Sequence, residues 1–300
     1  MDEPAPGPEQ VLRATASPTL AGDWSLVLAS AGIAHRVVGS AGAFSLVVGA
    51  ADADAGGAAL AAYDVESVPA IIPPAPDLGP SALGILSGAV LLAMFIVTGP
   101  RDAPVPTAWF DVGSASAAAI VHGQWWRAIT ALTLHADVLH LVGNVIASLI
   151  FVSAVGRWLG PGLGACLIVG CAAVANGLTA LWHRKDFVSV GASTATFAAL
   201  GLVAGLQLIR RWRHDVRRRY AWLPLGAGLG LFAMLGVGEH ADVGAHLFGL
   251  SAGAAAGAAV AAMGVRAPGR LGQALLIALV SAVLVGAWLL AFRTSGRAPS

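Results

Sequence analysis

Seven apolar segments follow one another along the chain beyond residue 80, separated by short connections that contain polar residues, glycine or proline. They cover residues 82–98, 137–155, 162–181, 192–209, 222–238, 243–264 and 272–292. Several have the ~20 residues that a helix needs to cross a hydrocarbon core of ~30 Å. The pattern therefore predicts an all-α, polytopic membrane bundle with seven spanning helices.

The first 80 residues follow a different pattern. GDWSLVLASAGI predicts a short amphipathic helix, HRVVGSAGAFSLVV two short strands around a Gly-Ser-Ala-Gly turn, and DADAGGAALAAYDVES a second helix. We therefore expect a small αββα module, of α+β class, over residues 18–68. A docking role for a cytoplasmic partner and a purely structural role both remain open for it.

The organisation expected from these patterns has five parts. Residues 1–17, with three early prolines, form a flexible start, and residues 69–80 form a proline-rich linker after the module. Residues 81–264 form the membrane core of six helices. Residues 265–300 add a seventh, C-terminal helix and a tail.

Composition supports a membrane protein. Of the 300 residues, 57% are apolar and only 11% are charged. The 17 basic and 16 acidic residues nearly cancel, which gives no argument for binding nucleic acid. Cys166 and Cys171 lie five residues apart in one apolar segment, a spacing that points them away from each other on a helix, so no disulfide is expected. We also expect no removable signal peptide.

The strongest signal for orientation is the basic stretch RRWRHDVRRR at 210–219, which the positive-inside rule assigns to the cytoplasm. Alternation then places the N-terminal module inside, and the connections 99–136, 182–190 and 239–242 outside. The bias toward arginine is typical of a GC-rich bacterial genome. The expected location is thus a bacterial plasma membrane, crossed several times, with a cytoplasmic N-terminus.

Under this topology, three helices carry polar residues at a similar depth near the outer surface. These are His140 and Asn144 on the second helix, Ser193 on the fourth and His246 on the sixth. Each residue alone is more often a packing residue or interhelical hydrogen-bonding group. Their common depth favours a functional site instead, because polar groups inside a membrane are costly and usually face the bundle interior or a wet cavity.

The chemistry of this set is that of acyl transfer. A histidine can take the proton of a serine hydroxyl and later return it to a leaving amine. We therefore interpret Ser193 and His246 as a catalytic dyad, since no acidic residue lies at a matching depth to complete a triad. Ser193 opens its helix, so backbone N–H groups face the developing oxyanion. His140 and Asn144 are further donors to that charge. No metal and no other cofactor is implied.

Three stretches in this order resemble the motifs of the rhomboid intramembrane serine proteases: GQWWRAITALTLHADVLHLVGN, GASTATFAALG and AHLFGLSAG. The resemblance covers roughly residues 80–264 and implies six core helices, here followed by a seventh. Its motif residues other than the dyad fall on the positions Trp126, Arg127, His135, His140, Asn144, Gly191 and Gly249. It also implies substrates that are single-pass transmembrane proteins in the lipid bilayer, cleaved near the outer end of the spanning helix.

The sequence departs from the family pattern at two positions. Thr194 stands where the glycine after the nucleophile is expected, at a place where neighbouring helices approach closely. Gly156 stands where an acidic residue of a Glu-x-Arg-like pattern is common. The first departure bears on activity, and the second on how a loop is anchored.

Other mechanisms and other classes of protein fit the sequence less well. A zinc protease needs an HExxH-like pair, which is absent, and an aspartyl protease needs two membrane aspartates. A metal site from Glu239, His240, Asp242 and His246 would straddle a tight loop. A transporter would need charged residues within its spans and an internal repeat. The main alternative is a catalytically impaired rhomboid-like protein that binds membrane segments without cutting them, with Thr194 as its best support.

Overall fold

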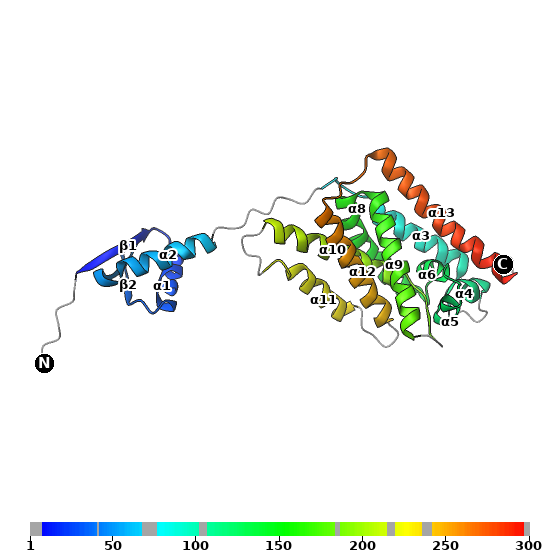
Figure 1. Ribbon diagram of the computed structural model, residues 1–300, viewed down its shortest axis with the longest axis horizontal. Coiled ribbons are helices and arrows are strands. Elements are labelled where there is room, and N and C mark those ends of the chain that lie inside the picture. The colour runs from blue at the N-terminus through cyan, green and yellow to red at the C-terminus, as the bar shows by residue number, and fades with distance from the viewer. Residues whose placement is uncertain are drawn as a thin grey trace. The chain divides into compact units, whose positions relative to one another are not determined.

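The computed structural model describes residues 8–40, 42–67, 77–101, 107–183, 187–214, 220–235 and 242–296. The chain divides into two compact units, residues 1–71 and residues 72–300 (Figure 1). The first unit contains a small sheet and two helices, and the second is mostly helical. This agrees with the predicted combination of a membrane bundle and a small α+β module.

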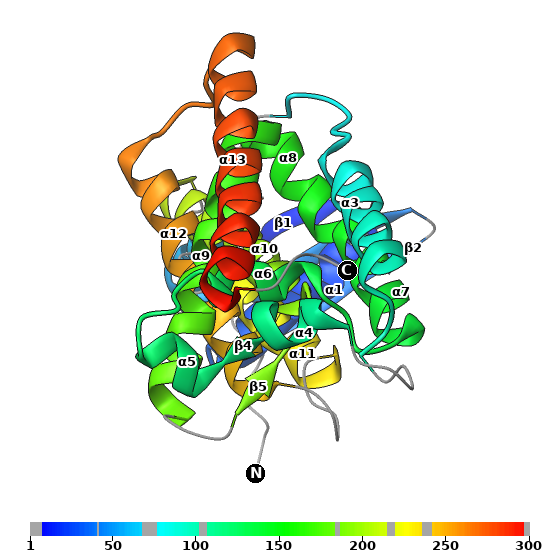
Figure 2. The same cartoon turned by 90° about the vertical axis from the view of Figure 1, so that its right-hand side faces the viewer.

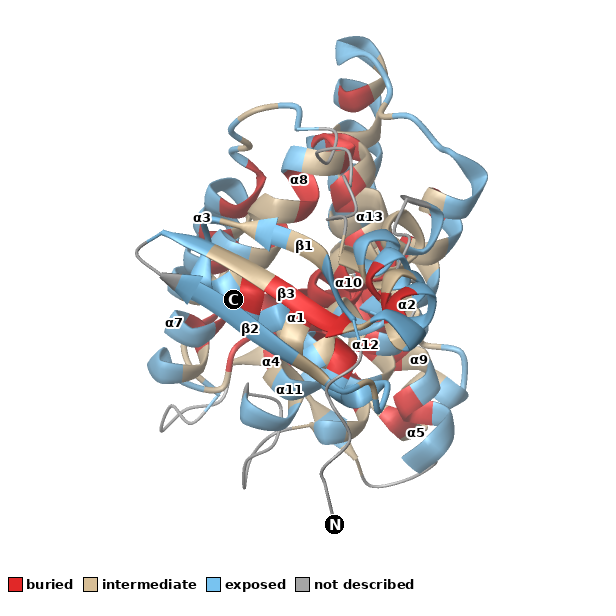
Figure 3. Ribbon diagram, turned by 90° about the vertical axis from the view of Figure 1, so that its left-hand side faces the viewer, coloured by how far each residue is buried: buried red, intermediate tan, exposed pale blue. Residues whose placement is uncertain are grey.

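The N-terminal unit is a three-stranded antiparallel sheet with helices. In chain order it contains β1 (Glu9–Thr15), α1 (Pro18–Ser30), β2 (His35–Ser40), β3 (Ala43–Gly49), η1 (Ala50–Asp52) and α2 (Ala53–Ser67). The strand order is β1-β3-β2, with the buried part of β3 in the middle (Figure 3). The expected αββα order is therefore incomplete, because a strand lies within the segment 1–17 that we expected to be flexible. Only two large apolar residues, Val11 and Leu12, occur in β1, so its sequence has no alternating apolar pattern that predicts a strand. The segment is a strand because it pairs with β3.

One face of this sheet carries the core of the N-terminal unit. Leu46 and Val48 of β3 pack with Trp24 and Leu28 of α1 and with Leu60 of α2. The hydroxyl of Ser17 caps α1 by accepting a hydrogen bond from the backbone N–H of Leu20. The unit thus has its own hydrophobic core, as expected of a separate domain.

Among the residues that the structure describes, the second unit contains seven apolar helices. They are α3 (Leu83–Thr98), the continuous helix formed by α7 (Val138–Ala147), the π-helical turn η3 (Ser148–Val152) and α8 (Ser153–Leu159), and then α9 (Pro161–His183), α10 (Ser193–His214), α11 (Leu223–Leu235), α12 (Val243–Met263) and α13 (Arg270–Ser295). Within the described residues, five are long and apolar enough to cross a membrane, whereas α3 and the apolar helix at 223–234 are shorter. The unit is thus built as a polytopic membrane protein.

The connection between α3 and α7 contains short elements, as does the segment before α10. They are α4 (Ala108–Gly113), β4 (Ala115–Ser116), α5 (Ala117–Val121), α6 (Arg127–Thr130), η2 (Ala131–Thr133) and β5 (Val188–Ser189). Strand β4 pairs antiparallel with β5. This small ribbon joins the long connection to the chain segment that leads into α10.

Helices α10 and α12 pack with their backbones in contact. A Cβ atom added to Gly201 of α10 would lie 2.1 Å from the carbonyl oxygen of Leu250. A Cβ atom on Gly253 of α12 would lie equally close, 2.1 Å, to the carbonyl oxygen of Ala198. Such small-residue interfaces are typical of membrane helices, because apolar side chains alone give no hydrophobic driving force in lipid. The two helices are therefore held at a fixed, short separation.

Helix α13 lies along the outside of the bundle (Figure 2) and contacts α9, α6 and α4. Near its start, the buried side chain of Gln273 accepts hydrogen bonds from the backbone N–H groups of Gly162 and Leu163 and donates one to the carbonyl of Leu159. Near its end, the indole N–H of Trp288 donates to Thr133 Oγ1 at 3.2 Å. The added helix is thus attached to the core at both ends.

Replacing Gln273 by alanine is expected to lower the free energy of unfolding by about 1–3 kcal/mol, because the buried N–H group of Gly162 and the partly buried N–H group of Leu163, at the start of α9, lose their acceptor. Thermal unfolding of the full chain in detergent measures this. Leu275→Ala is the matched control, since Leu275 lies on the same helix with 62% of its surface exposed. Equal melting temperatures for Gln273→Ala and the unaltered chain would contradict the role of Gln273.

Candidate active site

Ser193 is the first residue of α10, and the preceding turn brings it against α7 and the segment 131–133. Gly191 has a φ of +134°, a conformation that favours glycine, and its N–H donates to the carbonyl of Ala131 at 2.9 Å. A Cβ atom on Gly191 would lie 2.5 Å from Cε1 and 2.7 Å from Nε2 of His140, and 3.6 Å from Ser193 Oγ. Glycine at this position therefore lets the imidazole of His140 approach the serine.

The hydroxyl of Ser193 meets the imidazole of His246 from α12. Ser193 Oγ and His246 Nε2 lie 2.7 Å apart, a hydrogen-bond distance. The imidazole is buried, with 6% of the residue exposed, and the ring of Phe197 packs against it with the ring centroids 4.6 Å apart. Asp242 caps α12 by accepting a hydrogen bond from the N–H of Ala245. Two separate helices thus bring a hydroxyl and a base into contact.

Further buried polar groups come from α7 and the residues before it. Asn144 is buried, and its Nδ2 has no hydrogen-bond partner within the described residues. His135 is fully buried, and its ring packs edge-on against that of His140, with the centroids 5.4 Å apart. Burial lowers the pKa of His135 to about 4, so this imidazole is neutral at neutral pH. An unpaired buried donor such as Asn144 Nδ2 can stabilise an anion.

Trp126 and Arg127 organise the connection between α3 and α7. The guanidinium of Arg127 donates to Gln124 Oε1 and to the backbone carbonyls of Ser114 and Asp111. Burial lowers the pKa of Arg127, while the nearby Asp111 carboxylate opposes this change. Trp126 is itself buried in a cluster with residues of α13. Both residues therefore hold the connection in place.

Thr194 is accommodated by the glycine opposite it. A Cβ atom on Gly249 of α12 would lie 2.6 Å from the carbonyl oxygen of Thr194 and 3.4 Å from its Cγ2. In the family pattern, a glycine after the serine lets the two helices approach closely. Here Gly249 of α12 provides the space for this close approach to α10. The Ser193–His246 hydrogen bond forms with Thr194 in place.

Comparison with known proteins points to one family. The Rhomboid domain family matches residues 122–263. The putative rhomboid protease YdcA of Bacillus subtilis is 30% identical over 145 residues, which are 48% of this chain and 72% of that protein. The chain belongs to the rhomboid family. The rhomboid protease GluP of the same organism is 29% identical over 180 residues, and RHOMBOID-like protein 1 of Arabidopsis thaliana is 32% identical over 148 residues. The chain spans only 33% and 36% of the length of these two relatives.

The family match confirms the resemblance inferred from the sequence motifs. In this rhomboid, the predicted residues Ser193, His246, His140 and Gly191 come together at one end of the bundle, where α7, α10 and α12 begin. Within the described part of the chain, no three His, Cys, Asp or Glu side chains are placed to hold a metal ion. Glu239 and His240, named in the alternative metal site, lie outside the described residues.

Two contributors to the site and its anchoring were not predicted. Phe197 lies four residues after Ser193, so helical periodicity already placed both on one face of α10. Near Gly156, which replaces the acidic residue of the family pattern, Arg157 forms an ion pair with Asp77. A Cβ atom on Gly156 would lie 2.2 Å from Ser81 Oγ, so the segment before α3 passes directly over this glycine. The rhomboid thus anchors this region through Asp77.

Replacing Thr194 by glycine is expected to leave activity nearly unchanged and to lower the free energy of unfolding by about 1 kcal/mol, because the helix gains a flexible residue and loses packing against Gly249. Cleavage rate and thermal unfolding of the full chain measure the two effects. Ala195→Gly, at the neighbouring half-buried position, is the control for added helix flexibility, since Ala195 does not face Gly249 in the contacts of that glycine. A large gain in activity for Thr194→Gly would show instead that threonine impairs the dyad.

Proposed function

We propose that this rhomboid is an intramembrane serine endopeptidase that cleaves the transmembrane segments of membrane proteins through a dyad of Ser193 and His246. The observation that carries the proposal is the 2.7 Å contact between Ser193 Oγ and His246 Nε2, made by residues 53 positions apart on different helices. The names of its relatives YdcA and GluP, both called rhomboid proteases, support the same activity.

In the proposed reaction, His246 takes the proton of the Ser193 hydroxyl as the oxygen attacks the carbonyl carbon of the scissile peptide bond. Negative charge develops on the carbonyl oxygen, where His140, Asn144 and the N–H groups at the start of α10 are the candidate donors. His246 then gives its proton to the leaving amine. Water, activated by the same imidazole, hydrolyses the acyl-enzyme and regenerates the serine.

The substrates are proposed to be single-pass transmembrane proteins within the lipid bilayer. A helical substrate must unwind before its peptide carbonyl can reach Ser193, because a helix buries its backbone within its own hydrogen bonds. Helix-breaking or small residues near the cut site are therefore expected in substrates. No cofactor is needed for this chemistry.

The proposed arrangement in the membrane has seven crossings, six of the core and one by α13. The basic residues between α10 and α11 then face the cytoplasm, and the start of α10, with Ser193, lies near the outer surface. The N-terminal module is cytoplasmic under this orientation. Its separate core suits it to dock a cytoplasmic partner, a role that stays a proposal.

A fluorophosphonate probe tests the proposal directly, because it reacts with activated serines. The full chain in detergent is expected to be labelled at Ser193, as identified by mass spectrometry of the labelled peptide. Ser189→Ala, four residues earlier on β5, should keep the label. Folded protein that takes no label and cuts no model membrane substrate would favour the alternative, a rhomboid-like binder without catalysis.

A further inference from the structure

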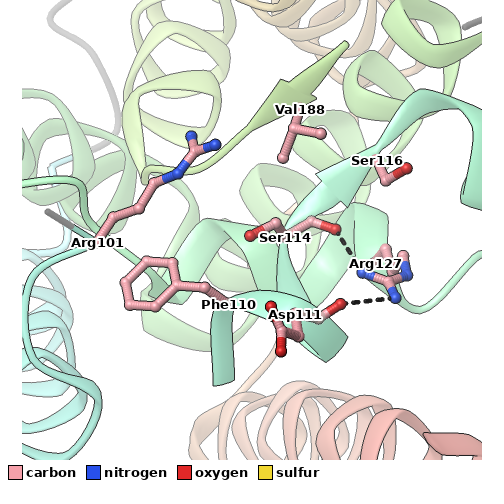
Figure 4. Close-up of a pocket in the computed structure, with 7 residues that line it drawn as sticks. All are labelled: Arg101, Phe110, Asp111, Ser114, Ser116, Arg127 and Val188. Atoms are coloured by element: carbon pink, nitrogen blue, oxygen red, sulfur yellow. Dashed lines mark hydrogen bonds between the residues drawn. The ribbon is translucent and has the colours of Figure 1, made fainter. Parts of the chain in front are cut away.

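A pocket of about 310 Å³ opens beside the β4–β5 ribbon (Figure 4). Its lining comes from the turn after α3, from α4 and the residue after it, from the ribbon and from the start of α6: Arg101, Phe110, Asp111, Ser114, Ser116, Arg127 and Val188. None of these residues belongs to α7, α10 or α12, the helices that carry the proposed catalytic groups. The pocket is therefore a separate feature of the molecule.

The charged groups of the pocket leave one arginine available to a ligand. The two arginines approach from opposite sides in Figure 4. Arg127 is committed to the carbonyls of Ser114 and Asp111. Arg101 has its backbone N–H fixed by the carbonyl of Ala136 at 2.8 Å, whereas its guanidinium makes no hydrogen bond or ion pair with any part of the chain that the structure describes.

The net charge of the lining suits a singly charged anion. Among the lining residues that the structure describes, two guanidinium groups and the carboxylate of Asp111 leave one positive charge. A guanidinium presents a planar fork of N–H groups that matches phosphate oxygens in geometry as well as charge. The Asp111 carboxylate disfavours ligands with several negative charges. A phosphodiester, which carries a single charge, meets both conditions.

The location of the pocket indicates that the phosphodiester belongs to a membrane lipid. The pocket lies at the end of the bundle where α9 ends and α7 begins. Trp125 and Trp182 at this end are exposed by 56% and 76%, as expected of tryptophans at the level of lipid headgroups. Phe110 and Val188 add an apolar wall to the pocket. A glycerophospholipid offers a phosphodiester joined to an apolar glycerol ester at this depth.

We propose that this pocket binds the headgroup phosphate of a membrane phospholipid, with Arg101 as its main ligand-contacting residue and Phe110 and Val188 against the glycerol backbone. An acidic segment of a peptide substrate fits less well, because the pocket shares no lining residue with the helices that must hold the scissile bond. The site is independent of whether the dyad cuts peptides.

Binding to the full chain in detergent tests this, with dioleoyl phosphatidylglycerol as the probe, read by native mass spectrometry and thermal unfolding. Dioleoylglycerol, which has the same chains without phosphate, and inorganic phosphate are the two comparison ligands. We expect binding of phosphatidylglycerol alone. Arg101→Gln should weaken it about tenfold, since hydrogen bonds to a charged group are lost, and should leave the melting temperature without lipid unchanged because Arg101 is exposed.

Arg293→Gln is the matched control. Arg293 is an exposed arginine in the last turn of α13, where neighbouring Phe292 packs against Trp109 beside the pocket wall, but it does not line the pocket. Its replacement should leave phosphatidylglycerol binding unchanged. An equal loss in both variants would overturn the proposal in favour of general surface charge. Equal binding of inorganic phosphate would overturn the proposal and show that the pocket binds a free anion. Equal binding of dioleoylglycerol would overturn it and show that apolar contact alone is enough. Displacement of the lipid by an acidic peptide would overturn it and assign the pocket to substrate.

Discussion

Replacing Ser193 by alanine is expected to reduce cleavage of a model transmembrane substrate by about 10⁴-fold or more, because it removes the hydroxyl that is hydrogen-bonded to His246 Nε2. The fold should survive, since the change removes one half-buried oxygen atom and alanine is a good helix residue. Cleavage in proteoliposomes, followed by the appearance of the product fragment, measures the first effect. The melting temperature in detergent measures the second.

A variant of the second dyad residue, His246→Ala, and a control variant, Ser189→Ala, complete this test. His246→Ala should cost nearly as much as Ser193→Ala, and the double variant should be no worse than either, because the two groups act as one unit. Ser189→Ala, on β5 shortly before the dyad serine, should cleave at close to the normal rate. Cleavage that persists in Ser193→Ala would assign the reaction to another nucleophile.

Sequence reasoning could predict which residues share a layer, because depth in a membrane follows from helix rise and span boundaries. It placed His140, Ser193 and His246 near one surface on three helices. It predicted the pairing of Ser193 with His246 from their chemistry and from the resemblance to the rhomboid motifs, and not from geometry, because the rotation of each helix depends on packing against its neighbours. That rotation is set by glycines such as Gly253, whose importance appears only when the facing backbone is seen.

The departures from expectation have the same origin in contacts between distant segments. Strand β1 has little apolar alternation, and it forms because it pairs with β3, whose residues lie 29 to 40 positions further along the chain. Thr194 departs from the family pattern, yet Gly249 on another helix supplies the missing space. A single sequence shows a substitution at one position without its compensation elsewhere. The seventh apolar segment was correctly expected as a helix, but its attachment through Gln273 required the position of α9.

Replacing Gly253 by valine is expected to lower the free energy of unfolding by at least ~3 kcal/mol and to abolish labelling of Ser193 by the fluorophosphonate probe. A Cβ atom at this position would lie 2.1 Å from the carbonyl oxygen of Ala198, so α10 and α12 must separate. The obstacle is backbone, which cannot rotate away as a side chain does. Separation of these helices would also move His246 out of reach of Ser193, because each helix carries one of the two groups.

Gly170→Val separates this effect from the general cost of placing valine in a helix. Gly170 lies in the middle of α9, and a Cβ atom there would meet nothing within 4 Å. Its replacement should change the melting temperature little and keep the label at Ser193. If Gly253→Val instead keeps both stability and labelling, the two helices have room to adjust, and backbone contact does not hold the dyad together. If it keeps the fold but loses the label, the contact sets the reach between Ser193 and His246 without limiting stability.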